Sequence, residues 1–382
     1  MKQIKISFRA ICSLLSLIMT LPSLASEIGV TEGTIKLGQT ATFSGQAAEL
    51  GIGMNLGATI YFKELNAQGG VAGRKIELLK DDDNFEPGMA AENTAQFIDK
   101  DKVFALFGYV GTATTNAALS KVGQAQIPLF APLTGAPSLR DPVNPYVFNV
   151  RASIFDEIEH IIQQLSTTGV KTIAVFYQND ADGKAGLDGV KRALKTFTSV
   201  RLLETVGIER NAMELRDSAA KLEAAKPEAI IQISSYSSSA KLIKEMRQSG
   251  YQGQFYNVSF VGSRALSEQL GASGRGVIIA QVVPSPWNSQ RAIVREYQKA
   301  MRKAGNKDYD FTSLEGYIAA KTFSEILRKV GRNLTREKFL EAAETMGRID
   351  LGDFWVTFTP NSHSGSQFVE LVIIGKDGTF VR

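Results

Sequence analysis

The sequence predicts an α/β protein of two lobes, each with a central parallel sheet, and three observations support this prediction. Short apolar runs alternate with amphipathic helical stretches from residue 34 to residue 282, the order that parallel sheets with right-handed crossovers produce. The chain has 382 residues, more than one hydrophobic core usually organises. Loops near residues 148, 283 and 352 interrupt the alternation, which indicates a clamshell whose hinge has three chain segments.

The individual elements follow from residue type and spacing. Strand-like runs are short and apolar, whereas the segments between them repeat apolar residues at helical spacing. Strands are expected at 34–39, 75–80, 103–107, 127–131, 172–177, 200–206, 228–233, 254–258 and 277–282, with helices at 52–66, 87–99, 114–124, 154–167, 185–196, 213–225, 238–249 and 264–270. Beyond residue 283, helices are expected at 289–303, 312–329 and 335–345, and strands at 354–358 and 367–374.

The loops divide the chain into interleaved lobes. The turn-rich segment from Leu139 to Pro145 ends the first alternating half, and Val283 to Trp287 ends the second. We therefore expect a first lobe of residues 26–148 plus 283–352. The second lobe is expected to contain residues 149–282 plus 353–382.

The N-terminal residues predict export. Basic side chains precede an apolar run from Ala10 to Leu24, and the small residues Ser23 and Ala25 provide the −3 and −1 positions of a cleavage site. We predict a cleaved signal peptide over residues 1–25 and a periplasmic location. The alternative, a membrane anchor, is disfavoured because the run is shorter than the ~20 apolar residues of a spanning helix. Removing the three basic residues of this segment lowers the formal charge from +4 to +1, and no basic run interleaved with aromatic residues remains, so nucleic acid is not an expected partner.

Cysteine and histidine usage argues against catalysis and metal binding. The only cysteine, Cys12, lies in the predicted signal peptide, so the mature chain has no thiolate for a disulfide, nucleophile or metal site. His160 and His363 are far apart and have no partner at ligand spacing. A solvated helix face is the simpler interpretation of His160, which follows two glutamates. We therefore expect no enzyme activity and no metal.

Two further motifs do not fit a cofactor or calcium. Gly51, Gly53 and Gly57 miss the dinucleotide-binding spacing and lie inside a predicted helix, so no cofactor is expected. The acidic run 81–84 resembles the start of a calcium loop but lacks the required downstream glycine and glutamate. Strand-end polarity and capping of the helix at Pro87 explain the run better.

Three loops rich in hydroxyls and glycines follow predicted strands of the first lobe. They are Thr42–Gly45, Gly108–Thr115 and Pro132–Pro137. N–H groups at helix N-termini attract carboxylates, and ligands collect at the carboxyl edge of parallel sheets. Ordinary N-capping explains any one of these loops, but three at one edge favour a ligand site.

The chain resembles a known family at this point: the branched-chain amino acid type (Leu/Ile/Val-binding-like) of periplasmic substrate-binding protein, the receptor of an ABC importer. The resemblance extends over essentially the whole mature chain. Its motifs are Phe43-Ser44-Gly45, residues 66–73, the loop 108–115, Ile127–Pro132, Ile173–Tyr177 with Asp180 and Gly183, and Lys244–Gly250.

The resemblance implies a type I periplasmic binding protein fold, with two Rossmann-like lobes, a three-segment hinge and a ligand in the cleft. It also implies a monomer that binds a small carboxylate, amide or amino-acid-like ligand and docks on a membrane permease. By resemblance, Thr112 donates to the ligand carboxylate, and the backbone of Leu133, Thr134 and Gly135 makes a further polar contact. Ser44, Tyr236 and Ser259 lie at positions where relatives line the pocket, Tyr236 coming from the second lobe.

Two positions depart from the amino-acid pattern. Asp182 stands where relatives usually have an aromatic residue, and no acid lies near Ser259 to pair with a ligand ammonium. A buried ammonium without a counter-charge is costly. Either the ligand has no amine, or Asp182 provides the missing charge. A solvated turn residue is an equally simple interpretation of Asp182.

Two alternative functions remain open at the level of sequence. A ligand-sensing subunit that reports to a membrane receptor would use the same cleft. An exported hydrolase is disfavoured, because the chain has two histidines and lacks a nucleophile elbow.

Overall fold

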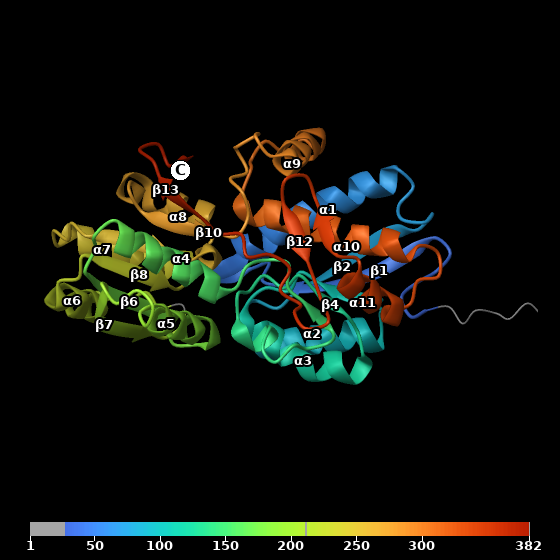
Figure 1. Ribbon diagram of the computed structural model, residues 1–382, viewed down its shortest axis with the longest axis horizontal. Helices are drawn as coiled ribbons and strands as arrows, with labels where there is room; N and C mark the ends of the chain where they lie inside the picture. The colour runs from blue at the N-terminus through green and yellow to red at the C-terminus, as the bar shows by residue number, and fades with distance from the viewer. Residues whose placement is uncertain (1–26, 211, 382) are drawn as a thin grey trace, which may run out of the picture.

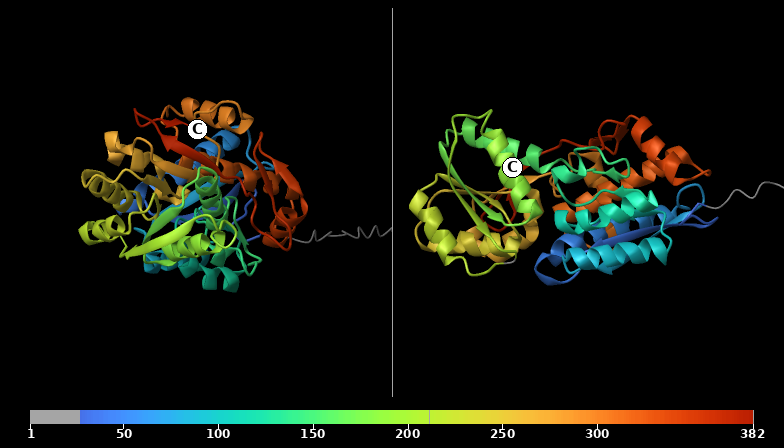
Figure 2. Two further views of the ribbon diagram at one scale, coloured as in Figure 1. Left: turned by 60° about the vertical axis from the view of Figure 1, so that its left-hand side comes forward. Right: turned by 90° about the horizontal axis from the view of Figure 1, so that it is seen from below.

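Two sheets, one parallel and one mainly parallel, form the centres of two lobes that lie side by side (Figures 1 and 2). The computed structural model describes residues 27–210 and 212–381, so the predicted signal peptide lies outside the described residues. The predicted α/β fold class is confirmed, with strands and helices alternating as expected. No helix in these two ranges is long and apolar enough to cross a membrane.

The first lobe is built on a five-stranded parallel sheet with the strand order β2-β1-β3-β4-β5. The strands are β1 (Thr34–Ala41), β2 (Lys75–Asp82), β3 (Ala105–Phe107), β4 (Leu129–Phe130) and β5 (Val147–Phe148). The helices that accompany this sheet are α1 (Ala48–Ala67), α2 (Pro87–Asp99), α3 (Thr112–Ala125), α9 (Ala292–Lys303), α10 (Phe311–Val330) and α11 (Arg336–Thr345).

Both faces of the first sheet are buried, because helices cover each of them (Figure 1). Leu106 of β3 packs in the cluster formed with α2 and α3. Its neighbour Phe107 points to the opposite face and meets Phe62 of α1 and Phe323 of α10, with ring centroids 5.6 and 6.0 Å away. Such two-sided burial explains the continuous apolar runs of the sequence.

Glycines allow α1 and α10 to pack with their backbones in close approach. A Cβ atom on Gly57 would lie 1.8 Å from the Ser313 carbonyl oxygen, and one on Gly316 would lie 2.1 Å from the Met54 carbonyl oxygen. Gly57 is therefore a helix-packing residue, which explains why a glycine recurs in α1 without a dinucleotide-binding spacing.

The second lobe is built on a seven-stranded sheet with the strand order β14-β13-β10-β9-β8-β6-β7. Its parallel strands are β6 (Thr172–Gln178), β7 (Arg201–Ile208), β8 (Ala229–Ile233), β9 (Gln254–Asn257) and β10 (Ile278–Gln281). The antiparallel strands β13 (Glu370–Ile374) and β14 (Phe380–Val381) extend one edge. The helices of this lobe are α4 (Ile154–Thr167), α5 (Ala181–Ala193), α6 (Arg216–Ala225), α7 (Tyr236–Gln248) and α8 (Ser263–Leu270).

The third passage between the lobes lies later in the chain than predicted. The strands β11 (Arg348–Asp350) and β12 (Trp355–Thr357) form a hairpin. Phe358 and His363, which follow it, pack on Phe148 of the first sheet, with ring centroids 5.2 and 3.9 Å away. The predicted assignment of all residues 353–382 to the second lobe does not agree with these contacts. We infer that the chain leaves the first lobe only after Ser364, which bridges to Asn149.

Candidate functional site

The strand order of each of the two sheets contains a switch point. In the first sheet β1 lies between β2 and β3, and in the second sheet β6 lies between β7 and β8. The loops that leave the carboxyl ends of such neighbouring strands run to opposite faces, which opens a crevice where ligands bind. Thr112 begins α3 after β3, and Asp182 and Tyr236 lie in the first turns of α5 and α7 after β6 and β8.

Thr112 and Asp182 bind each other across the cleft. The Thr112 N–H donates to Asp182 Oδ2 over 3.2 Å, and the Thr112 hydroxyl donates to Asp182 Oδ1. Thr112 Oγ1 also lies 2.6 Å from Thr134 Oγ1. The N-cap of α3 is Gly111, which has no side chain to cap the helix. A carboxylate from the second lobe therefore takes the place of a capping side chain.

The environment of Asp182 favours its protonated form. Burial, together with the Asp180 carboxylate beside it, raises the pKa of Asp182 to about 6, and the two hydrogen bonds from Thr112 limit the shift. Asp182 is partly shielded from solvent by the opposite lobe, and it is not a solvated turn residue in this structure. The position that departs from the amino-acid pattern thus lies at the centre of the contact between the lobes.

Two small cavities of about 20 Å³ each lie next to Asp182. Asp182, Ile233 and Phe260 line both of them. The first cavity is also lined by Thr112, Gly135, Ala136, Ile154, Glu157, Ala185 and Val258. The second is also lined by Ala47, Leu50, Phe85, Gln178, Ser234, Ser235, Tyr236 and Val261. Each holds little more than one water molecule, so the lobes are closed onto each other.

Aromatic residues that the sequence analysis missed complete this closure. Phe85 of the first lobe stacks on Phe260 of the second, with ring centroids 6.1 Å apart. The Arg210 guanidinium lies 4.7 Å from the Phe85 ring centroid and donates to the Phe85 carbonyl oxygen over 2.6 Å. Arg210 also pairs with Asp180 at 3.3 Å. The apolar Phe85 directly after the acidic run 81–84 was the available sequence signal.

Ser259 faces a buried cluster of charged side chains rather than a cavity. The Ser259 N–H and hydroxyl donate to the Glu157 carboxylate over 2.6 and 3.0 Å. Arg151 lies between Glu157, at 3.3 Å, and Glu315, at 3.6 Å. The acid that the sequence lacks near Ser259 therefore comes from α4. Burial raises the pKa of Glu157, and the Arg151 charge opposes that shift.

The sequence analysis missed Glu157 because it lies in an amphipathic helix with His160 three residues later. His160 is exposed, as predicted, but the helix turns Glu157 inwards, where it is 1% exposed. Burial of this carboxylate depends on Arg151, which lies six residues earlier and outside the predicted helix. The capping box of Ser153 and Asp156 fixes the start of α4 and thereby the orientation of Glu157.

The loop Leu133–Gly135 mostly satisfies its own backbone. Leu133 donates to the Tyr109 carbonyl oxygen over 2.6 Å and accepts from the Gly111 N–H over 3.2 Å. The Gly135 carbonyl oxygen accepts from Ile154 over 2.9 Å. Within the part of the chain that the structure describes, the Gly135 N–H has no acceptor. Of this loop, Gly135 lines the first cavity, Thr134 bonds to Thr112, and Leu133 bonds to the neighbouring Gly111.

Tyr236 lines one of the two cavities, whereas Ser44 lines neither. The exposed Ser44 bonds to Asn84 over 3.3 Å and does not line either cavity. Tyr236 is 6% exposed and lines the second cavity. Burial raises the pKa of Tyr236, and the Glu49 carboxylate of the first lobe raises it further. Tyr236 thus lies in the cleft close to Glu49 of the first lobe, whereas Ser44 lies outside both cavities, at the rim.

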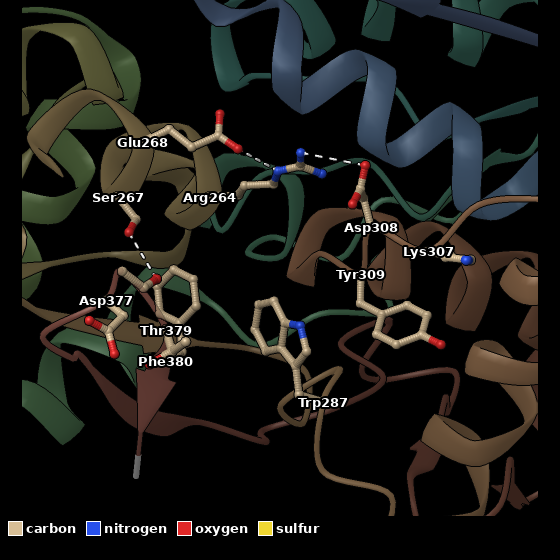
Figure 3. Close-up of a pocket in the computed structure, with 11 residues that line it drawn as sticks. Arg264, Ser267, Glu268, Trp287, Lys307, Asp308, Tyr309, Asp377, Thr379 and Phe380 are labelled. Atoms are coloured by element: carbon tan, nitrogen blue, oxygen red, sulfur yellow. Dashed lines mark hydrogen bonds and ion pairs between the residues drawn. The ribbon is translucent and has the colours of Figure 1, made fainter.

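A wider pocket of about 460 Å³ lies beside the hinge, away from these residues (Figure 3). Trp287 stacks on Phe380 there, with ring centroids 5.3 Å apart. Arg264 pairs with Glu268 at 2.7 Å and with Asp308 at 3.8 Å. None of the predicted site residues lines this pocket, and no switch-point loop reaches it, so we place the candidate site in the cleft.

The described residues offer no metal site. Within residues 27–210 and 212–381, no three His, Cys, Asp or Glu side chains are grouped so that they could hold a metal ion. His363 is buried and lies 3.0 Å from the carbonyl oxygens of Asn144 and Val147 and from the Glu344 carboxylate. These contacts give His363 a structural position in the first lobe.

Known proteins share both the sequence pattern and this architecture. The family model described as periplasmic binding protein matches residues 34–379. The Leu/Ile/Val-binding protein homolog 7 of Brucella abortus is 25% identical over 78% of this chain and 77% of its own length. An amino acid binding protein of Pseudomonas aeruginosa is 22% identical over 75% of this chain and 78% of its own length.

Solved structures of known proteins have the same fold as this chain. A possible leucine/isoleucine/valine-binding protein from Rhodopirellula baltica superposes with a TM-score of 0.85 at 32% identity, covering 94% of this chain and 98% of its own. A substrate-binding periplasmic protein from Ralstonia solanacearum gives a TM-score of 0.85 at 33% identity, covering 91% and 99%. These relatives are substrate-binding proteins rather than enzymes. The chain therefore belongs to the periplasmic binding protein family, with the type I fold of its Leu/Ile/Val-binding-like members.

Proposed function

We propose that this protein is a periplasmic solute receptor of an ABC importer. It binds a small carboxylate or amino-acid-like ligand between its lobes and delivers that ligand to a membrane permease. The observation that carries the proposal is the bond between Thr112 and Asp182, since the N-terminus of α3 presents an N–H and a hydroxyl that hold a carboxylate. An amino acid offers the same group.

The walls of the cleft suit the aliphatic body of such a ligand. Ile154, Ile233 and Val258 line the first cavity, and Leu50 and Phe260 line the second. Apolar walls with few convergent polar groups are typical of small-molecule sites. The names of the Brucella abortus and Rhodopirellula baltica relatives, which refer to leucine, isoleucine and valine, support the same ligand class.

Binding works by a shift between open and closed lobes. A ligand that touches Thr112 of the first lobe and Tyr236 of the second stabilises the closed form, because only that form offers both contacts. The hinge of three segments allows the lobes to rotate as rigid bodies. The closed form then presents a surface composed of both lobes to the permease.

Thermal unfolding tests the binding step. The protein is unfolded in denaturant, refolded to remove co-purified solutes, and heated with leucine, isoleucine, valine, 4-methylpentanoate, benzoate and 2-methylpropanamide. A true ligand at 100 times its Kd adds about 2.7 kcal/mol to the free energy of unfolding. Thr112→Ala should lose this stabilisation, whereas Ser44→Ala, which removes an exposed rim hydroxyl, should keep it. If no solute of this kind raises the unfolding temperature, the proposal is wrong.

Transport is tested separately in cells. Deleting the gene should abolish uptake of the radiolabelled solute that stabilises the purified protein, and restoring the gene should return uptake. Unchanged uptake, together with binding in vitro, would refute delivery to a permease.

A further inference from the structure

The carboxylate site of the cleft is already occupied by a carboxylate of the protein itself. The two oxygens of Asp182 take the N–H and the hydroxyl of Thr112, which are the donors assigned to the ligand. Two carboxylates cannot share this donor pair, because both would be buried side by side with the same charge. A ligand carboxylate can bind at Thr112 only if Asp182 leaves.

We propose that Asp182 is a built-in occupant of the carboxylate site and that the ligand is a zwitterion which exchanges places with it. The ligand carboxylate takes the two donors of Thr112, and the released Asp182 carboxylate pairs with the ligand ammonium. This inference rests on the proposed function of the cleft and specifies its ligand class.

The shape of the cleft supports the exchange. Asp182, Ile233 and Phe260 line both cavities, and we infer that they form the partition between them. Neither cavity, at about 20 Å³, accommodates an amino acid. Moving this one side chain away from Thr112 removes the polar part of the partition. The space that opens is bounded by Ile154 and Val258 on one side and by Leu50 on the other.

The charges around the cleft select a zwitterion. Glu157 is paired with Arg151 at 3.3 Å, and Asp180 is paired with Arg210 at 3.3 Å. No cation of the described residues forms an ion pair with Asp182 itself. A ligand with only a carboxylate would leave the released Asp182 charge unpaired in a closed cleft, and a ligand with only an ammonium would leave the Thr112 donors unfilled. A zwitterion satisfies both groups without changing the net charge of the cleft.

Three ligands that share one aliphatic body separate these cases. Leucine carries both charges, 4-methylpentanoate only the carboxylate, and 3-methylbutylamine only the ammonium. The affinity of each is measured by titration calorimetry for the wild type, Asp182→Ala and Asp182→Asn. Asp188→Asn is the matched control, because Asp188 is an exposed acid on the same helix α5.

The wild type should bind leucine at least about tenfold more tightly than either single-charge analogue. Asp182→Ala and Asp182→Asn should weaken leucine binding by about tenfold or more, and should strengthen 4-methylpentanoate binding because its competitor at Thr112 is gone. Asp188→Asn should bind all three ligands as the wild type does. Equal leucine affinity in the wild type and Asp182→Ala, or weaker binding of 4-methylpentanoate to Asp182→Ala, would overturn the exchange while leaving the solute receptor intact.

A measurement on the ligand-free protein tests separately whether Asp182 occupies the two donors of Thr112. In the ligand-free protein, the NMR chemical shift of the Thr112 backbone amide proton should change with pH as Asp182 titrates, with a midpoint at about pH 6. In Asp182→Asn this chemical shift should stay constant. The titratable and charged groups around Asp182 are Asp180, Arg210, Glu157 and Tyr236. Asp188 is not among them, so Asp188→Asn must leave the titration curve of the Thr112 amide unchanged. A Thr112 amide that does not respond to pH in the wild type would overturn the inference even if no solute binds.

Discussion

Replacing Arg151 by methionine should destabilise the protein strongly, because Arg151 holds two buried carboxylates together. Arg151 follows β5 in the first passage between the lobes, Glu157 belongs to α4 of the second lobe, and Glu315 belongs to α10 of the first. All three residues are buried: Arg151 is 2% exposed, Glu157 1% and Glu315 8%. The methionine side chain retains most of the volume of arginine but removes its charge and its donors.

The expected loss follows from the geometry of this cluster. Removing one partner of a buried ion pair costs about 3–5 kcal/mol, because the remaining charge is left without compensation. Here the distances from the guanidinium to Glu157 and Glu315 are 3.3 and 3.6 Å. Ser259 still donates two hydrogen bonds to Glu157, so we expect about 3 kcal/mol rather than the upper value.

The loss should depend on pH in a defined direction. Burial already raises the pKa of Glu157 and of Glu315, and the Arg151 charge opposes both shifts. Without Arg151, both pKa values in the folded state rise further above those of the unfolded chain. The folded variant then binds more protons than the unfolded variant, so its stability increases as the pH falls. The difference from the wild type should therefore be larger at pH 8 than at pH 5.

Urea unfolding followed by circular dichroism at both pH values measures these differences. The double variant Arg151→Met/Glu157→Gln should recover at least about 1 kcal/mol relative to the sum of the two single variants, since neighbouring charges are coupled. A loss below about 1 kcal/mol for Arg151→Met, or a strictly additive double variant, would refute the account of Arg151 as the counter-charge of this cluster.

Two further predictions concern the first lobe. Asp83 is fully buried and accepts hydrogen bonds from Thr40 and Phe85 over 3.0 and 2.9 Å, and burial raises its pKa from 3.8 to about 6. Because the folded state binds this proton more tightly than the unfolded state, the wild type loses stability as the pH rises from about 4 to 6. Asp83→Asn should remove this part of the pH dependence and be more stable at pH 7 by up to about 3 kcal/mol; identical thermal unfolding profiles of the two proteins between pH 4 and 7 would contradict it. Gly57→Ala should destabilise the protein by about 3 kcal/mol or more, because the new Cβ atom would meet the Ser313 carbonyl oxygen at 1.8 Å. The matched variant Gly123→Ala, in α3 with open space around it, should be neutral or gain up to about 1 kcal/mol, and equal losses in the two variants would argue against a close helix crossing.

The periodicity of the sequence was sufficient to predict the two sheets and nearly all helices, since each element carries its own apolar pattern. It did not predict the position of the third passage between the lobes. The hairpin β11–β12 is stabilised by pairing within itself and by Phe358 on Phe148. The local pattern of residues 353–364 does not predict which of the two lobes this segment joins. Its position depends on the contact between Phe358 and Phe148, which are far apart in the sequence.

The candidate site was predictable to the extent that it lies at helix N-termini. Thr112, Gly135, Asp182 and Tyr236 line the cavities, and the loops that carry them follow strands that the sequence identifies. Glu157 was missed because its burial depends on Arg151, and one helix pattern cannot distinguish a solvated acid from one turned towards a cation outside the helix. The carboxylate exchange at Thr112 also concerns two residues in separate lobes, whose approach only the folded structure reveals.

The interleaving of the two lobes has a consequence for the order in which the protein is made. Helix α1 packs on α10, whose residues 311–330 are synthesised much later, and β10 lacks its neighbour β13 until residue 374 has been added. The first lobe therefore cannot complete its core until most of the second lobe has been translated, and the second lobe still lacks β13 when the first is complete. The usual sequence of N-terminal domain first and C-terminal domain second does not apply, and both lobes mature late in synthesis, through long-range contacts that form slowly.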